Sequence, residues 1–285
     1  AVGVDIHLRH ARAGVASGQF KVMMSPSNVG VNLRNQGQKV GMVNILTNGI
    51  TQLMCKGSAI ASPQDLVGKK ILVPFKNDMP DIVLQALLKK LKIDAHKVGI
   101  TYTATPPEAV GLFLSKDYHA AILPEPMASA SMLKGKTMGV NVVRGFDLVK
   151  AWGQAFDTKP LIPMAGIIAN EEYFHAHKAQ FDIFHQDLKN ALNWILANRQ
   201  SAAKIGKNYL PAPEPALVMG LDGARLTVTK GSEVKNEILK FYEILMQFNP
   251  KLLGGKLPEN GWDLLFKPEY TNKLKSCGIA LWDTP

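Results

Sequence analysis

The amino-acid sequence predicts an α/β protein in which the strands of mostly parallel sheets alternate with helices that flank them. Short apolar runs of strand length recur along residues 1–165, and most are followed by a run with the spacing of an amphipathic helix. This alternation is typical of parallel sheets, because helices form the connections between their strands. A chain of 285 residues is also long enough for two lobes, each with its own core.

The strands are predicted from apolar runs that end at Gly, Pro, Asn or Ser, the residues that commonly form turns. The expected strands cover residues 4–8, 20–24, 39–46, 51–55, 70–73, 98–104, 120–123 and 166–170. Several of these runs are continuously apolar, which indicates strands that are buried on both faces of a sheet.

The helices are predicted from apolar spacing and from residues that cap helix ends. Ser62 and Pro63 have the pattern of a single helical turn, and Thr105 and Glu108 have the spacing of a capping box. Helices are expected from near Val29, over 80–93, 105–114 and 124–135, and then at 171–198, 201–209, 214–221 and 232–248.

Composition excludes several functional classes. The formal charge is +10, but the lysines form only short groups without interleaved aromatic residues, so we expect no nucleic-acid partner. No apolar run approaches the ~20 residues that span a bilayer, so the chain is not expected to cross a membrane. Cys55 and Cys277 could pair or stay as thiols, and their spacing does not suggest a metal site. His175 and His177 point in different directions on a helix, so no metal is expected there either.

Polar loops follow successive predicted strands. In open α/β sheets, ligands bind beyond the carboxyl ends of the strands, where helix N-termini present free amide groups. The candidate loops are residues 25–28, 47–49, 75–80, 105–107 and 124–127. Each loop also has a structural explanation, because Ser and Thr cap helices and Pro fixes turn geometry.

The order of four motifs resembles a known family. Residues 16–21 (ASGQFK), 65–71 (DLVGKKI), 102–108 (YTATPPE) and 120–126 (AAILPEP) resemble the periplasmic binding proteins of nitrate, sulfonate, taurine and thiamine-precursor ABC importers. The resemblance runs from residue 13 to 258 and implies a two-lobed type II periplasmic-binding-protein fold. It implies a first lobe of residues 1–57 and 166–285 and a second of 58–165, with two hinge crossings near 56–58 and 164–166. That family has a further strand and helix ahead of residue 4, so this unit is expected to be missing here or built differently.

The resemblance also implies a role and a site. The role is that of a non-catalytic protein that binds a small organic ligand with an anionic or polar head, needs no cofactor and meets the membrane permease of an ABC importer. The expected location is periplasmic or otherwise extracytoplasmic, with a lipid anchor as one option. The ligand-facing residues carried over by position are Ser25, Ser27, Asn28, Thr47, Asn48, Lys76, Asn77, Asp78, Met79, Thr105 and Glu125, with Trp152 as a weaker candidate.

Two alternatives share the expected fold. One is an enzyme, such as the iron-dependent synthase of the thiamine pyrimidine or an enzyme of menaquinone biosynthesis, with Asp78 and Glu125 as an acid–base pair. The synthase needs a cysteine-rich motif, whereas Cys55 and Cys277 stand alone. The other is the effector lobe of a transcription regulator, which would need a helix-turn-helix ahead of residue 1. Fold alone does not separate these alternatives from a binding protein.

Overall fold

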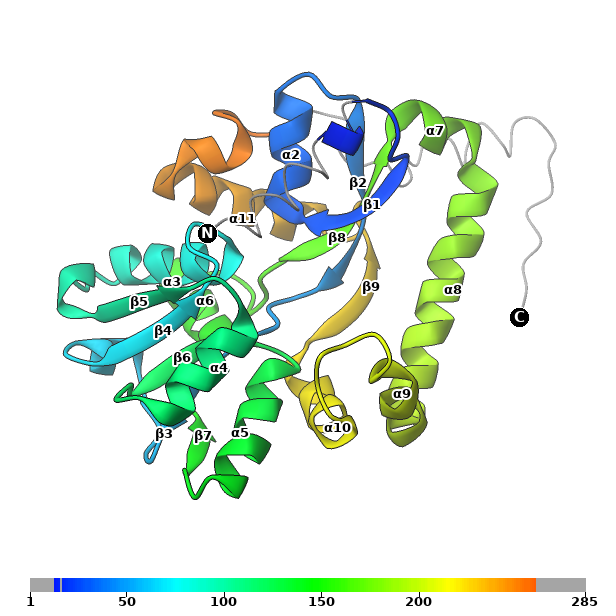
Figure 1. Cartoon of the computed structure of the whole chain (residues 1–285). Helices are drawn as coiled ribbons and strands as arrows, with labels where there is room; N and C mark the ends of the chain where they lie inside the picture. The colour runs from blue at the N-terminus through cyan, green and yellow to red at the C-terminus, as the bar shows by residue number, and fades with distance from the viewer. Residues whose placement is uncertain (1–12, 16, 260–285) are drawn as a thin grey trace.

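The computed structural model describes residues 13–15 and 17–259, and its strands form two sheets, one in each of two lobes (Figure 1). The first sheet contains, in spatial order, β1 (Val22–Pro26), β8 (Ala165–Asn170), β2 (Val40–Thr47) and β9 (Leu226–Lys230). The second contains β5 (Gly99–Thr103), β4 (Lys70–Pro74), β6 (Ala120–Pro124), β3 (Thr51–Lys56) and β7 (Val142–Arg144). Helices flank both sheets, so the α/β prediction is confirmed.

The strand directions differ in part from the mostly parallel sheets that we expected. In the second sheet, β4 is parallel to β5 and β6, but β3 is antiparallel to β6 and β7. In the first sheet, β8 is antiparallel to both β1 and β2, and β9 is antiparallel to β2. The reason is topological. β1 and β2 run in the same direction, and β8 lies between them after the chain has returned from the second lobe.

The boundary between the lobes was predicted too late in the sequence. Residues 51–57 were expected in the first lobe, but Thr51 lies opposite Pro124 and Met54 lies opposite both Ala121 and Arg144, so β3 belongs to the second sheet. The first crossing is therefore the three-residue link between β2 and β3, where Gly49 has a φ of 97°. Two apolar strands separated by so short a link resemble a hairpin in sequence, which hides the change of sheet.

Most helices lie where the apolar spacing predicts them. They are α2 (Ser27–Asn35), α3 (Met79–Lys90), α4 (Pro106–Ser115), α5 (Met127–Thr137), α6 (Leu148–Phe156), α7 (Glu171–Ala176), α8 (Lys178–Ala197), α9 (Arg199–Gly206), α10 (Glu214–Gly223) and α11 (Lys235–Phe248), with single turns η1 (Pro63–Leu66), η2 (Ala95–Lys97) and η3 (Pro250–Leu253). The helix predicted over 171–198 is divided at His177, and α6, β7 and β9 were missed. β7 is only three residues long, whereas Asp147 caps α6 in a recognisable way.

The second sheet is covered on both faces. Ile71 and Val73 of β4 contribute to one apolar cluster with Leu84 of α3, whereas Leu72 contributes to another with Phe113 of α4. This alternation follows from the two-residue period of a strand. It explains the continuous apolar run at this position of the sequence.

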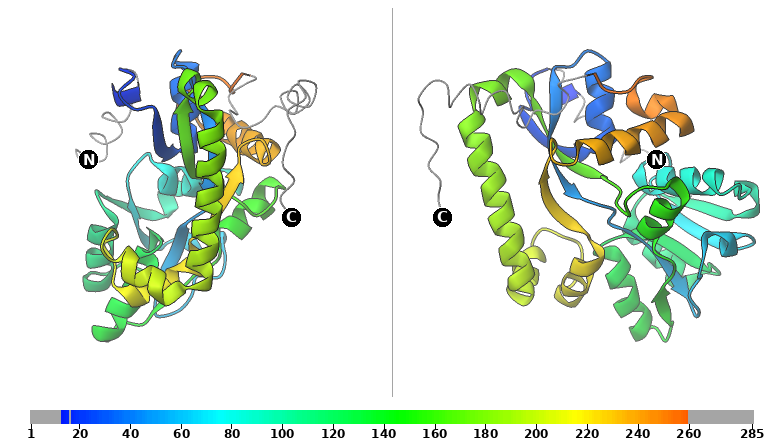
Figure 2. Two further views of the ribbon diagram at one scale, coloured as in Figure 1. Left: turned by 90° about the vertical axis from the view of Figure 1, so that its right-hand side faces the viewer. Right: turned by 180° about the vertical axis from the view of Figure 1, so that it is seen from behind.

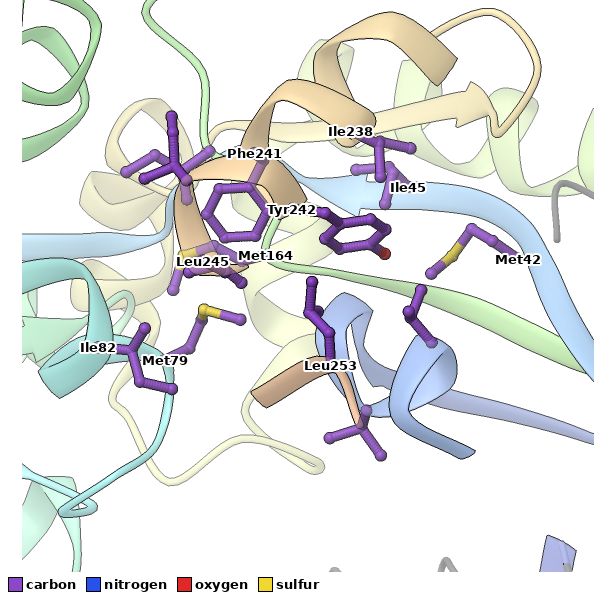
Figure 3. Close-up of a cluster of buried hydrophobic side chains, with 14 of the residues drawn as sticks. Met42, Ile45, Met79, Ile82, Met164, Ile238, Phe241, Tyr242, Leu245 and Leu253 are labelled. Atoms are coloured by element: carbon purple, nitrogen blue, oxygen red, sulfur yellow. The ribbon is translucent and has the colours of Figure 1, made fainter. Parts of the chain in front are cut away.

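A third apolar cluster joins the two lobes (Figure 3). Met79 and Ile82 of α3, in the second lobe, belong to the same cluster as Phe241 and Leu245 of α11, in the first. Figure 3 shows these side chains together with Met164 from the second crossing. The two lobes are therefore in apolar contact beside the crossings.

Some predictions fall outside the described residues. These are the strand at 4–8, a unit ahead of it, and Cys277 with the end of the chain, so the pairing of Cys55 and Cys277 stays a prediction. Cys55 itself is buried in β3. Within residues 13–15 and 17–259, no helix combines the length and the apolar character that crossing a bilayer requires.

Candidate functional site

The carboxyl ends of β1 and β2 lie together at one edge of the first sheet. Pro26 at the end of β1 and Thr47 at the end of β2 both lie opposite Ala165, the first residue of β8. The polar segments at 25–28 and 47–48 therefore flank the same strand. The sequence prediction that these two loops lie close together agrees with this register.

Ser27 anchors this edge to the second crossing. Its amide donates to the carbonyl oxygen of Met164 at 2.9 Å, and its hydroxyl donates to the carbonyl oxygen of Pro163 at 2.6 Å. The hydroxyl of Tyr242 in α11 donates to the carbonyl oxygen of Ser27 at 3.0 Å. The Ser27 side chain is fully buried, so its visible contacts are structural. Ser25 is also buried and bonds locally to the carbonyl of Pro26.

Two further polar side chains at this edge have buried atoms without a hydrogen-bond partner in the described part of the chain. They are the Oδ1 atom of Asn28 and the Oγ1 atom of Thr47, on residues that are 8% and 5% exposed. Leaving such an atom unpaired costs about 1–3 kcal/mol. Helix α2 begins beside them, and its first turn has neither a side-chain cap nor an acidic residue. Its amides and the positive end of its dipole therefore face this edge with no acidic residue in the first turn of the helix.

The second sheet presents the ends of β4, β5 and β6 at a common edge. These strands are parallel neighbours, and the amide of Phe75 after β4 donates to the carbonyl of Thr103 at the end of β5. Phe75 and Asn77 have φ angles of 60° and 64°, so the loop turns sharply before α3. The predicted site loops at 75–80, 105–107 and 124–127 thus lie along one edge.

Carboxylates occupy the start of α3. Asp78 is its N-cap, with Oδ1 accepting from the amide of Met79 at 2.7 Å, and the amide of Asn77 donates to Asp81 at 2.9 Å. Burial raises the pKa of Asp78 above its ordinary value, and the hydrogen bond from Met79 opposes that rise. Of the two arrangements left open for this loop, the structure shows Asp78 as the cap.

Lys76 and Tyr102 lie together beside α3. The Lys76 amine is 5.1 Å from the centre of the Tyr102 ring, and the Tyr102 hydroxyl donates to Asp81 at 3.0 Å. Burial, together with the negative charge of Asp81, raises the pKa of Tyr102 to about 12. Neither Tyr102 nor Asp81 was among the predicted site residues, because one lies within a strand and the other within the first helical turn.

The remaining predicted residues have structural surroundings. Thr105 is exposed and caps α4 by accepting from the amide of Glu108 at 3.3 Å, as predicted. The Glu108 carboxylate accepts from the amide of Ala104 at 2.8 Å and not from that of Thr105, so one half of the predicted capping box is confirmed. Met79 lies in the core between the lobes, 4% exposed. Trp152 is 1% exposed and forms part of the lining of a surface hollow of about 280 Å³ between residues 157–161 and α11. Trp152 is thus a core residue of α6, and not part of either strand edge.

Glu125 is enclosed on all sides. Its Oε1 atom lies 2.5 Å from Arg144 Nη2, and its Oε2 atom accepts from the amide of Ser129 at 3.1 Å. Positions Gly220 and Gly223 of α10 pack directly against its carboxylate. Both oxygens are engaged, so Glu125 fastens its loop to the surrounding protein.

The two edges are joined by the first crossing. Only residues 48–50 separate Thr47, at the edge of the first sheet, from Thr51, which lies opposite Pro124 at the edge of the second. The amide of Asn48 donates to the carbonyl of Arg225 at 3.1 Å. Arg225 in turn contacts Asp147 at 2.5 Å, a pair that sequence reasoning missed.

Comparisons with known proteins agree with this architecture. A family model described as NMT1/THI5 like matches residues 8–202. The putrescine-binding periplasmic protein PotF of Escherichia coli is 50% identical over 34 residues, which cover 12% of this chain and 9% of the relative, so the match spans a small part of that protein.

Two solved structures have the same fold at low sequence identity. An ABC transporter protein from Parabacteroides distasonis superposes with a TM-score of 0.74 and 17% identity, covering 91% of this chain and 86% of that one. The periplasmic aliphatic sulphonate binding protein SsuA of Escherichia coli gives 0.65 and 17%, covering 87% and 82%. The lobes described above are therefore those of the periplasmic-binding-protein fold, and because its model matches well over half of the sequence, the chain belongs to the NMT1/THI5-like family.

Proposed function

We propose that this protein is the solute-binding component of an ABC importer, which binds a small organic molecule between the two strand edges and delivers it to a membrane permease. In this role it is extracytoplasmic, and it binds its ligand without catalysis. The observation that carries the proposal is the pair of buried atoms without partners, Asn28 Oδ1 and Thr47 Oγ1, at the edge of the first sheet. A ligand that bonds to them recovers part of the ~1–3 kcal/mol that each unpaired atom costs.

The charges at the two edges differ, and this difference supports a ligand with an anionic or polar head. Helix α2, on the first lobe, has no acidic residue in its first turn. The helices that begin at the edge of the second lobe each have a carboxylate at their start, contributed by Asp78 and Asp81, by Glu108 and by Glu125. An anion is favoured at the α2 terminus, and hydrogen-bond donors are favoured near the exposed part of the second edge.

The relatives support a small solute and differ in its charge. SsuA is named for aliphatic sulphonates, which are anions, and PotF for putrescine, a dication. The uncapped N-terminus of α2 supports an anionic group on the ligand, as in a sulphonate. The Asp78 carboxylate at the start of α3 supports a polar or amino group at the other end of the ligand.

A ligand screen tests the proposal directly. Thermal unfolding of the whole protein would be followed with alkyl sulfonates, nitrate, pyrimidines, aromatic acids and putrescine. A ligand at 100 times its Kd stabilises the folded state by about 2.7 kcal/mol, so an organic anion should give a clear shift. No shift with any compound, or a shift with nitrate alone, would contradict the proposed ligand class.

A variant of Thr47 tests the site. Thr47→Val keeps the shape of the side chain and removes an oxygen that has no partner in the described protein. The free protein should be as stable as wild type or more so, whereas affinity for the ligand found in the screen should fall at least about tenfold. Thr101→Val, at an exposed position in β5, is the matched control. Unchanged affinity in Thr47→Val would place the ligand elsewhere.

A further inference from the structure

The segment of residues 199–224, which contains α9 and α10, lies between two elements of the first lobe. Helix α8 precedes it, and β9, which pairs with β2 in the first sheet, follows it. Chain order alone would therefore assign this segment to the first lobe, as the expected division at residue 166 did.

The packing of α10 is with the second lobe. Figure 1 shows α10 beside α5, and Ala130 of α5 shares an apolar cluster with Ala203 of α9 and with Ala216 and Leu217 of α10. These contacts are made largely by small side chains, which lets the helices approach closely.

The contact continues to the loop that follows β6. A Cβ atom at Gly220 would lie 3.0 Å from Glu125 Oε2, and one at Gly223 would lie 2.6 Å from Glu125 Oε1. The side chain of Gln52 in β3 donates to the carbonyl of Gly223 at 2.9 Å. A separation of 2.6 Å leaves no room for a side chain, so glycine is what allows α10 to cover the Glu125 carboxylate.

The two ends of the segment have the geometry of bending points. Asn198 ends α8 and precedes α9 with φ −126° and ψ 48°, which interrupts the helix. Arg225 follows α10 with a φ of 46°, in the left-handed region that side chains rarely adopt. Hinges are commonly a few residues at the ends of elements that absorb such changes in backbone angle. The two views of Figure 2 show α9 and α10 at the carboxyl-terminal end of the long helix α8.

We infer that residues 199–224 form a strap that moves with the second lobe, so that the chain crosses between the lobes four times. The crossings are residues 48–50, residues 157–164, Asn198 and Arg225. The strap covers the loop at 124–127, one of the candidate ligand loops, and Arg225 ties its exit to Asp147 of the second lobe. Opening or closing of the lobes must then bend the chain at Asn198 and Arg225 as well as at residues 48–50 and 157–164.

Native-state hydrogen exchange tests this assignment, because elements that unfold together exchange together. Gly223→Ala places a methyl group against Glu125 and should loosen the strap from the second lobe. We expect exchange about tenfold faster in both the strap and α5, with α2 and α11 unchanged. The matched control is Gly111→Ala in α4, where a Cβ meets nothing within 4 Å.

Four other outcomes would overturn the inference. Faster exchange in α8 and β9 with α5 unchanged would assign the strap to the first lobe. Faster exchange in the strap alone would make it an independent unit, and an equal rise throughout, or no rise at all, would show that the contact does not define a separate unit. Should Gly223→Ala fail to fold, Gly220→Ala, whose Cβ lies 3.0 Å from the carboxylate, gives the same comparison with a milder clash.

Discussion

The ion pair between Glu125 and Arg144 allows the strongest prediction about stability. The Glu125 side chain is 1% exposed and the Arg144 side chain 33% exposed, with 2.5 Å between Oε1 and Nη2. Arg144→Met removes the cation and leaves the carboxylate with the amide of Ser129 as its hydrogen-bond donor. A buried charge without its counterion destabilises the folded state, because water no longer solvates it.

The magnitude follows from this burial. Removing one partner of a buried pair costs about 3–5 kcal/mol, and the partial exposure of Arg144 places the expected loss for Arg144→Met near 3 kcal/mol. For a chain of this size, that loss lowers Tm by roughly 6–12 °C. Glu125→Gln keeps an oxygen for Ser129 and should cost only about 1–2 kcal/mol.

Urea denaturation of the two single variants and the double variant is the assay. The double variant has no buried charge, so it should be more stable than Arg144→Met. A double variant no more stable than Arg144→Met, or an Arg144→Met protein within about 0.5 kcal/mol of wild type, would refute the reasoning. A Glu125→Gln protein with wild-type stability and no ligand affinity would restore Glu125 as a ligand residue.

Three further variants test the start of α3. Asp78→Ala should lose about 1 kcal/mol of unfolding free energy in urea as a lost cap, while Asp78→Asn, which can still accept from Met79, should match or exceed wild type at pH 7. The raised pKa of Asp78 favours its protonated form in the folded state, so its contribution to stability falls as pH rises from 3.8 through the folded pKa, and Asp78→Asn should lack this change. Tyr102→Phe removes the hydrogen bond to Asp81 and should cost about 1 kcal/mol. The pKa of Tyr102 is about 12 in the folded state and 10 ordinarily, so wild type should lose stability as pH rises from 10 to 12. The absorbance of the phenolate should report the ionisation of Tyr102 over the same range.

The local parts of this structure could be predicted from the sequence. Asp78 and Thr105 cap helices with partners one to three residues away, so their roles depend on local spacing. The βα alternation from residue 70 to 137 is likewise set by apolar periodicity and turn residues.

The long-range parts could not be predicted in the same way. Glu125 follows a strand as a ligand residue would, but its environment depends on Arg144 and on two glycines in a helix much later in the chain. The sheet to which β3 belongs is decided by pairing with β6 and β7, both of which come later. Apolar periodicity indicates that a residue is buried, and it does not indicate which partner buries it.

His185 shows the same limit and leads to a last prediction. No motif or spacing in the sequence marks this residue, but it is 3% exposed in α8, and neither ring nitrogen has a hydrogen-bond partner in the described residues. Burial lowers the pKa of His185 below 6.5, and the charges of Lys230 and Lys189 lower it further, while Glu233 opposes them.

The unfolded chain therefore binds a proton at His185 more readily than the folded protein does. The stability that neutral His185 provides is complete above pH 6.5 and is lost as pH falls from 6.5 toward the folded pKa. His185→Gln should remove this loss from urea midpoints measured across that range, whereas the exposed His175→Gln control should retain it. Equal pH dependence of the urea midpoint in wild type and His185→Gln would show that burial does not hold the His185 ring neutral in the folded state.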